Sequence, residues 1–254
     1  MSGERRRLFL SEIMESILSP YEASTVYEEE VVGEFENELE VEFFNNFVEE
    51  VGRGRVVLDL ACGDGRHTLK LSENAGCVVA LDLSLNMLRM ARDKCSPSLN
   101  ISFVRGSMFN LPFREEAFDG VWFSQAFEYA PPDRRVELLT ELREVLREEG
   151  VLYMSVETWM YPSLWKSLRG LLGDFKLYFY WKFIKRKPLM WGEFLYYLTG
   201  EGGGGYRGWH YHVHTSRWAL TRLLEACRFK VLNLSLRDGY IYVLCIPTKQ
   251  SSQE

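Results

Sequence analysis

Short apolar runs alternate with helical patterns through the middle of the chain. The runs at residues 55–61, 77–83, 101–105, 120–123 and 151–156 are typical of buried strands. Between the runs, apolar residues recur at roughly helical spacing, at Leu85, Leu88, Met90 and Ala91 and then at Val136, Leu139, Leu142, Val145 and Leu146. Strands that alternate with helices predict a doubly wound, mostly parallel α/β sheet.

The end of the chain changes character. Residues 216–226 predict a helix, and residues 229–236 and 239–246 predict two strands joined by Arg237-Asp238-Gly239. Asp-Gly between apolar runs is a strong hairpin signal, because glycine accepts a positive φ. We therefore expect seven strands, the last two forming an antiparallel C-terminal hairpin. Ser84 is expected to cap the helix after the second strand, and Pro131-Pro132-Asp133 to open the helix after the fourth.

Two segments stand outside this central domain, which we place at residues 51–247. Residues 1–50 predict an acidic helical cap, with an apolar face at Val41, Phe44, Phe47, Val48 and Val51. Residues 158–208 form an aromatic and basic insertion that ends near the tract Gly202-Gly-Gly-Gly205. Within it, apolar residues at helical spacing favour a helix packed on its own domain, at Leu164, Leu168, Leu171, Leu172, Phe175 and Phe179. A lid over a hydrophobic small molecule, a membrane-surface patch and an RNA contact are the alternatives.

The formal net charge of −6 conceals two blocks of opposite sign. Residues 1–50 hold 14 acidic and 3 basic residues, whereas residues 158–214 hold 8 basic and 3 acidic residues. Such blocks indicate either a lid that folds over a core or two faces with different partners, and two solvated faces remain an alternative. We expect both segments to cover the mouth of the ligand site.

Composition excludes several classes of protein. Hydrophobic residues make up 46% of the chain and charged residues 26%, which is ordinary for a globular domain. The five cysteines are scattered without a Cys-x-x-Cys pair, a pattern that favours reduced thiols in a cytoplasmic protein over disulfides or a metal site. The longest mostly apolar stretch, near residues 175–184, is broken by lysine and is too short for stable membrane insertion.

A glycine motif follows the first strand and carries the candidate chemistry. Gly63 and Gly65 permit a sharp turn and close approach of a ligand, but Thr68 stands where a dinucleotide fingerprint needs a third glycine. Asp59 would repel a pyrophosphate and attract a cation. Asp82, 17 residues beyond Gly65, is placed to accept hydrogen bonds from ribose hydroxyls. The motif therefore favours S-adenosylmethionine, whose product is S-adenosylhomocysteine, over NAD.

Residues 56–156 resemble the class I S-adenosylmethionine-dependent methyltransferases, especially the branch of ubiquinone and menaquinone biosynthesis. The resemblance rests on Val57-Leu-Asp-Leu-Ala-Cys-Gly-Asp-Gly65, Ala80-Leu-Asp-Leu-Ser84, Gly106 with Leu111-Pro-Phe113, Phe118-Asp-Gly-Val121, and Leu146–Met154. It implies a Rossmann-like fold. It also implies a cofactor site made of Asp59, Ala61, Cys62, Gly63, Gly65, Asp82, Leu83, Ser107, Met108, Ser124 and Gln125. Ser107 replaces the family's usual aspartate, and Tyr129 stands where the family often has histidine.

A second tract, Trp209-His-Tyr-His-Val-His214, supplies candidate catalytic residues. In an extended segment His210, His212 and His214 share one face, and Tyr211 and Val213 share the other. They are candidates for a general base or for donors to an anionic group, because histidine titrates near neutrality. A structural strip and a three-histidine metal site are the alternatives, and we expect no metal. We also expect at least one of the three to face the cofactor cavity.

These observations leave three functions open. The first is methyl transfer to a small-molecule or lipid-like acceptor, in which a base is needed only if the nucleophile is protonated. The second is methylation of RNA through Lys182, Lys185, Arg186 and Lys187, with stacking by nearby aromatics. Tyr211-His212-Val213 also resembles a tract in methyltransferases of transfer RNA wobble uridine. The third is a non-catalytic scaffold subunit, which the retained Asp59 and Asp82 argue against. The sequence does not indicate an oligomeric state.

Overall fold

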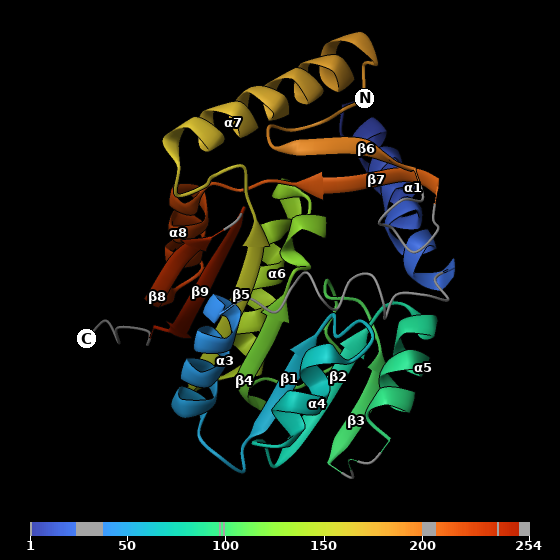
Figure 1. The fold of residues 1–254 in the computed structure, drawn as a ribbon. Helices are drawn as coiled ribbons and strands as arrows, with labels where there is room; N and C mark the ends of the chain where they lie inside the picture. The colour runs from blue at the N-terminus through green and yellow to red at the C-terminus, as the bar shows by residue number, and fades with distance from the viewer. Residues whose placement is uncertain are drawn as a thin grey trace, which may run out of the picture.

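The computed structural model describes residues 2–23, 38–96, 98, 100–199, 207–237 and 239–248. A seven-stranded sheet in the order β3-β2-β1-β4-β5-β9-β8 lies at its centre (Figure 1). The strands are β1 (Val56–Leu60), β2 (Cys77–Asp82), β3 (Ile101–Arg105), β4 (Phe118–Ser124), β5 (Leu146–Glu157), β8 (Phe229–Arg237) and β9 (Tyr240–Pro247). The first five pair in parallel, and β9 runs antiparallel to both β5 and β8. This confirms the predicted Rossmann-like class and its C-terminal hairpin.

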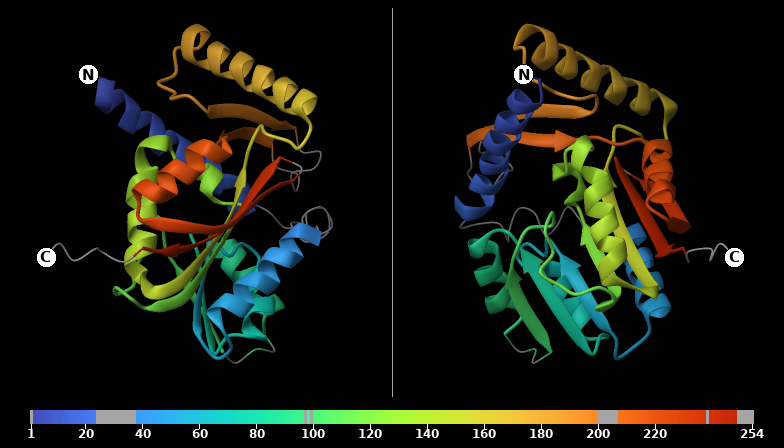
Figure 2. Two further views of the ribbon diagram at one scale, coloured as in Figure 1. Left: turned by 90° about the vertical axis from the view of Figure 1, so that its left-hand side faces the viewer. Right: turned by 180° about the vertical axis from the view of Figure 1, so that it is seen from behind.

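Helices cover both faces of the sheet. The helices on one face are α3 (Glu38–Val51), α4 (Arg66–Ser72) and α5 (Leu85–Lys94), and those on the other are α6 (Arg135–Val145) and α8 (Arg217–Ala226) (Figure 2). Successive side chains of a strand point to opposite faces. Val57 of β1 accordingly packs with Phe43 and Phe47 of α3, while Leu58 packs in the cluster of α6 and α8.

Local signals for helix ends and turns are confirmed. The Ser84 hydroxyl accepts a hydrogen bond from the Met87 backbone N–H at 3.2 Å, and the Ser216 hydroxyl accepts one from the Ala219 N–H at 3.3 Å. These caps satisfy amides that have no partner within the helix. Gly239 has a φ of +83°, as the hairpin requires, whereas Asp238 lies outside the described residues.

A separate layer, which we call the cap, lies beyond the carboxyl ends of the strands. It consists of α1 (Ser2–Ala23), α7 (Leu164–Phe179), the π-helical turn η3 (Tyr180–Ile184) and an antiparallel pair, β6 (Glu193–Thr199) and β7 (Arg207–Val213). Phe9, Ile13 and Ile17 of α1 pack on Tyr211 and Val213 of β7. In every view α7 lies at the outer edge of the molecule, above β6 and β7 (Figures 1 and 2).

Several expectations for the two outer segments are wrong in detail. Residues 1–50 do not form one cap, because α1 joins the cap while α3 packs on the sheet. Val41 is exposed, and Phe43 takes the predicted place in the buried face of α3. The helix α7 forms as predicted, but most of its apolar stripe faces solvent instead of its own domain. The tract Gly202–Gly205 lies outside the described residues.

Candidate functional site

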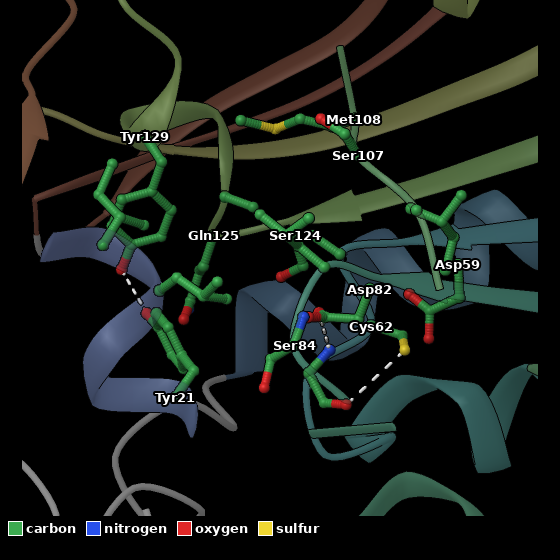
Figure 3. A pocket seen from close by; sticks show the side chains of 18 of the residues that line it. Tyr21, Asp59, Cys62, Asp82, Ser84, Ser107, Met108, Ser124, Gln125 and Tyr129 are labelled. Atoms are coloured by element: carbon green, nitrogen blue, oxygen red, sulfur yellow. Dashed lines mark hydrogen bonds between the residues drawn. The ribbon is translucent and has the colours of Figure 1, made fainter. Parts of the chain in front are cut away.

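A pocket lies at the carboxyl ends of β1, β2 and β4, with α1 as an additional wall (Figure 3). Open α/β sheets bind ligands at this edge, where the direction of the strand order reverses. Its lining includes Asp59, Ala61, Cys62, Gly63, Asp82, Leu83, Ser107, Met108, Ser124 and Gln125 from the central domain. It also includes Met14, Ile17, Leu18 and Tyr21 from α1. Ten of the predicted cofactor-site residues therefore lie around one cavity.

The loop after β1 brings backbone close to this cavity. Ala61 and Gly63 both have positive φ, of 55° and 54°, and a side chain added at Gly63 would meet no atom within 4 Å. Gly65 differs, since its φ is +83° and an added Cβ would lie 2.9 Å from the Cβ of Ala91. Gly65 does not line the pocket. Its role is close packing of the loop against α5, which corrects its assignment to ligand contact.

Asp59 and Asp82 place two carboxylates on the pocket wall, the first buried and the second partly buried. The Thr68 hydroxyl donates to Asp59 at 2.5 Å, and burial raises the pKa of Asp59 to about 7. The backbone N–H groups of Gly63 and Ser84 donate to Asp82 at 2.9 and 2.8 Å, although burial still raises the pKa of this carboxyl. In the described residues, neither carboxylate has a basic side chain within ion-pair distance. The pocket thus holds acidic groups without a cationic partner.

Backbone strain at the end of β4 aims further groups at the pocket. Gln125 has a φ of 51°, which is costly for a residue with a side chain and recurs at functional sites. Its N–H donates to the Ser155 hydroxyl at 3.0 Å, and that hydroxyl also lies 3.0 Å from the Ser124 hydroxyl. These bonds fix Ser124 and Gln125 on the pocket wall.

Comparisons with solved structures support this fold. The chain superposes on a structure titled "DhpI-SAH complex structure" with a TM-score of 0.68 at 22% identity, covering 94% of this chain and 98% of that one. It also superposes on an S-adenosylmethionine-dependent methyltransferase from Clostridium acetobutylicum with a TM-score of 0.62 at 17% identity, covering 88% and 96% of the two chains. At these identities the likeness establishes the fold.

Sequence comparisons go further. A family model described as "Methyltransferase domain" matches residues 57–150. A demethylmenaquinone methyltransferase of Lactococcus lactis is 36% identical over 118 residues, 44% of each chain, and one of Staphylococcus epidermidis is 31% identical over 128 residues, 49% of this chain and 52% of that one. The match spans about half the length of these curated relatives. Residues 57–150 are therefore similar to a methyltransferase domain, and this match, the named relatives and the fold together support the class I S-adenosylmethionine-dependent methyltransferase family.

The cofactor of this methyltransferase family is S-adenosylmethionine, and the donor set of the pocket fits it. A ligand with an ammonium and a sulfonium carries positive charge, which suits two carboxylates that have no basic partner. The open backbone at Gly63 leaves room for close approach. Leu83 and Met108 add apolar surface to the pocket.

The other end of the methyltransferase pocket contains a pair of phenols that sequence reasoning missed. The hydroxyls of Tyr21 on α1 and Tyr129 on η1 (Phe127–Tyr129) lie 2.6 Å apart and point toward one another (Figure 3). Met14, Ile17, Leu18 and Ala126 line the cavity around them with apolar surface. No motif surrounds Tyr21, so only the fold of α1 reveals it.

Glu40 of α3 is a second residue without a sequence signal. Its carboxylate is buried and lies 3.4 Å from the Arg66 guanidinium and 3.3 Å from His67 Nε2. The Ser124 hydroxyl also donates to it at 3.4 Å. Glu40 therefore ties α3 to three residues of the pocket wall.

The three tract histidines lie one layer behind the pocket. His210 and His212 share one face of β7 as predicted, and His214 directly follows the strand, but none of the three lines the cavity. The expectation that one would face it is corrected, since Tyr129 stands between: its hydroxyl lies 3.4 Å from His210 Nε2. Burial lowers the pKa of His210 to about 3, and the neighbouring His212 adds to this effect.

His212 and His214 instead pair with acids from distant elements. His212 Nδ1 donates to Glu157 at the end of β5, and His214 Nδ1 donates to Asp174 of α7 at 2.8 Å. Despite burial, the hydrogen bonds to Asp174 and Glu157 raise the pKa of His214 to about 10. We call these four residues, together with His210, the histidine cluster. Within the described chain no set of side chains has the arrangement of a metal site.

Proposed function

We propose that this protein transfers a methyl group from S-adenosylmethionine to a small, lipid-like acceptor. The observation that carries the proposal is the division of one pocket into two ends. Asp59 and Asp82 line one end, and apolar side chains of α1 line the other around the Tyr21–Tyr129 hydroxyl pair. The first end suits a cationic nucleoside, and the second suits an apolar molecule that carries one polar group.

At the cofactor end, the residues would bind and orient S-adenosylmethionine. S-adenosylmethionine supplies an electrophilic methyl group on its sulfonium. The Asp59 carboxylate would pair with the ammonium, and Asp82 would accept from the ribose hydroxyls with its remaining lone pairs. Leu83 and Met108 would enclose the adenine, with Ser124 and Gln125 beside the methionine end.

At the acceptor end, α1 would exclude water and align the nucleophile. Methyl displacement gains its rate from orientation and from a dry site. Met14, Ile17 and Leu18 supply an apolar wall of the kind that such an acceptor needs. The relatives named demethylmenaquinone methyltransferases support an acceptor of this lipid-like type.

The phenols and His210 form the polar part of this end. We propose that the Tyr21 and Tyr129 hydroxyls form hydrogen bonds with an oxygen of the acceptor, and that His210 holds Tyr129 in position. Because its pKa is about 3, the His210 imidazole is neutral at physiological pH and accepts the Tyr129 hydroxyl proton in a hydrogen bond. Of the three candidate catalytic histidines, His210 is thus the one that acts on the pocket, while His212 and His214 hold Glu157.

No observation favours the transfer RNA alternative. The relatives reported above carry the names of quinone methyltransferases, and apolar side chains wall the acceptor end of the pocket. A scaffold role would not require the carboxylates Asp59 and Asp82, whose desolvation costs free energy.

The test is transfer of labelled methyl to defined acceptors. The protein is incubated with labelled S-adenosylmethionine and, in separate reactions, with demethylated naphthoquinols, simple phenols and bulk transfer RNA, followed by mass spectrometry. We expect label in the quinol or phenol products. Label in RNA alone, or cofactor binding without transfer to any of the three, would contradict the proposal.

Replacement of His210 with alanine tests the acceptor end. Turnover should fall roughly 100-fold, because Tyr129 loses its partner, while cofactor affinity measured by calorimetry stays nearly unchanged. Tyr129→Phe should give a comparable loss. Tyr197→Phe, on the exposed side of β6, is the matched control. An equal loss of cofactor affinity in His210→Ala would mark His210 as a purely structural residue.

A further inference from the structure

The outer surface of α7 is apolar although it faces solvent. Leu164 and Trp165 are 86% and 77% exposed, and the other members of the stripe are between 45% and 54% exposed. At 3.6 residues per turn, the stripe spans an arc of about 100°. Its members are Leu164, Trp165, Leu168, Leu172, Phe175 and Phe179. Monomeric proteins rarely expose such a surface without a use for it.

The stripe continues beyond the helix as a run of aromatic contacts. The Phe179 ring lies 5.0 Å from that of Phe183, and the Phe175 ring lies 6.3 Å from that of Trp191. Phe183 and Trp191 are themselves 59% and 51% exposed. Together with the stripe they form one surface, which we call the α7 face. It lies at the edge of the molecule farthest from the sheet (Figure 1).

The exposed charged side chains of residues 158–199, which include the α7 face, are all positive. Exposed basic residues flank it at Lys166, Arg169, Lys176, Lys185 and Arg186. The only acidic residues within residues 158–199, Asp174 and Glu193, are both buried. His214 donates to Asp174, and Arg6 and Tyr211 donate to Glu193. A protein with a net charge of −6 thus presents a local surface of purely positive charge.

We propose that the α7 face docks the protein on the surface of an anionic lipid bilayer. A helix with an apolar stripe and basic residues beside it is suited to lie in the interface plane, with its aromatic and leucine side chains among the acyl chains. The basic side chains then meet anionic headgroups. In the described residues no helix is long and apolar enough to span a bilayer, so the contact is interfacial.

Other occupants fit the α7 face less well. A second copy would bring two sets of exposed cations together, because a two-fold interface uses the same patch twice and this patch has no exposed acid to pair them. RNA would gain from the cations and the aromatic rings, but the exposed leucine side chains within the same stripe offer it neither hydrogen bonds nor stacking surfaces.

Vesicle flotation of the full chain tests the proposal and requires no turnover, so it is independent of the acceptor. Vesicles of phosphatidylcholine with about one third phosphatidylglycerol should bind the protein, and pure phosphatidylcholine should bind it roughly tenfold less. About 0.5 M salt should weaken the anionic preference. Brominated acyl chains should quench tryptophan fluorescence, because Trp165 and Trp191 enter the bilayer.

Two double variants distinguish vesicle binding through the α7 face from nonspecific adsorption. Leu168→Glu combined with Leu172→Glu should lower vesicle binding at least roughly tenfold, since both side chains would have to enter the acyl region. Val136→Glu combined with Leu232→Glu, at exposed apolar positions on α6 and β8, should leave it unchanged. Absent vesicle binding, equal binding of the two double variants, a dimer that Leu168→Glu/Leu172→Glu dissociates, or tighter binding to transfer RNA than to vesicles would each overturn the proposal.

Discussion

The cofactor pocket and the histidine cluster both bury acidic side chains but neutralise them differently. In the pocket, Asp59 accepts a hydrogen bond from the Thr68 hydroxyl, and Asp82 accepts hydrogen bonds from backbone amides. In the cluster, two histidines contact Glu157, and one of them also binds Asp174. Burial raises the pKa of both pocket carboxyls, whereas His212 and His214 overcome burial and hold the pKa of Glu157 well below its usual range.

This difference distinguishes a region that binds a ligand from a region that links parts of the fold. An acid left without a cation inside a protein destabilises it until a positive ligand arrives, so the pocket is suited to a cationic cofactor. An acid that already has its cation links the elements that supply the pair. In the cluster these are β5, β7 and α7, which means that the ion pairs attach the cap to the sheet. Removing acids from the two regions should therefore have opposite consequences.

The largest effect is expected for Glu157→Gln, which removes charge from the cluster. Loss of one partner in a buried ion pair should lower the free energy of unfolding by about 3 kcal/mol. Calorimetric or chemical unfolding measures this, and Glu49→Gln at an exposed site on α3 is the control. Cofactor affinity should hardly change. A large loss of cofactor affinity with little loss of stability would show that the cluster serves ligand binding, as the pocket does.

The pH dependence of stability sharpens the same test. The low pKa of Glu157 stabilises the fold above its ordinary value of 4.5, and this contribution is lost as pH falls. The raised pKa of His214 stabilises the fold below 6.5, and this contribution is lost as pH rises toward about 10. The pair thus contributes fully between pH 4.5 and 6.5. The fall in stability above pH 6.5 should be shallower in Glu157→Gln than in the natural protein.

Asp82→Ala should have the next largest effect, and it should act on affinity. The variant loses the ribose acceptor and the hydrogen bonds that hold Gly63 and Ser84 in place, so S-adenosylmethionine and S-adenosylhomocysteine should both bind roughly 100-fold more weakly. Titration calorimetry measures this, with Asp93→Ala on the exposed side of α5 as the control. Preferential binding of NAD by the natural protein would refute the cofactor assignment.

The smallest effect is expected for Asp59→Asn, and its sign is the opposite of that for Glu157→Gln. Because the pKa of Asp59 is raised to about 7, the ligand-free protein loses stability as pH rises from about 4 through 7. The neutral amide should therefore raise stability at pH 8 by about 1 to 2 kcal/mol and leave it unchanged near pH 4. Thermal unfolding at both pH values decides this. Destabilisation at pH 8 would show that Asp59 already has a sufficient partner.

The sequence predicts the central domain well and the cap poorly, for a physical reason. Buried strands, the Ser84 cap and the Gly63 turn are set by local residue types, so each is visible along the chain. The partners of His212 and His214 come from residues 157 and 174, and spacing alone does not bring them together. Periodicity finds α7 but cannot say which face is buried. Nor does any pattern identify the pairing of β6 with β7 or of Tyr21 with Tyr129.

The opposite charge blocks show the same limit. The two segments do meet, but their strongest described contact joins Arg6 of the acidic segment to Glu193 of the basic one, while Lys187 and Glu12 lie 3.9 Å apart. α1 lines the pocket, and the described part of residues 158–208 contributes nothing to the lining. That insertion instead packs with α1 in one apolar cluster. Net charge therefore indicates that the segments associate, and individual positions determine how.

The helix α1 couples ligand binding in the pocket to the packing of the cap. Ile17 both lines the pocket and packs in the apolar cluster with Tyr211 and Val213. Coupling between two such sites is reciprocal. If a bound ligand favours the seated position of α1 by some free energy, the attachment of α1 to β7 must favour the ligand by the same amount. The attachment of the cap and the occupancy of the cofactor site would then each depend on the other.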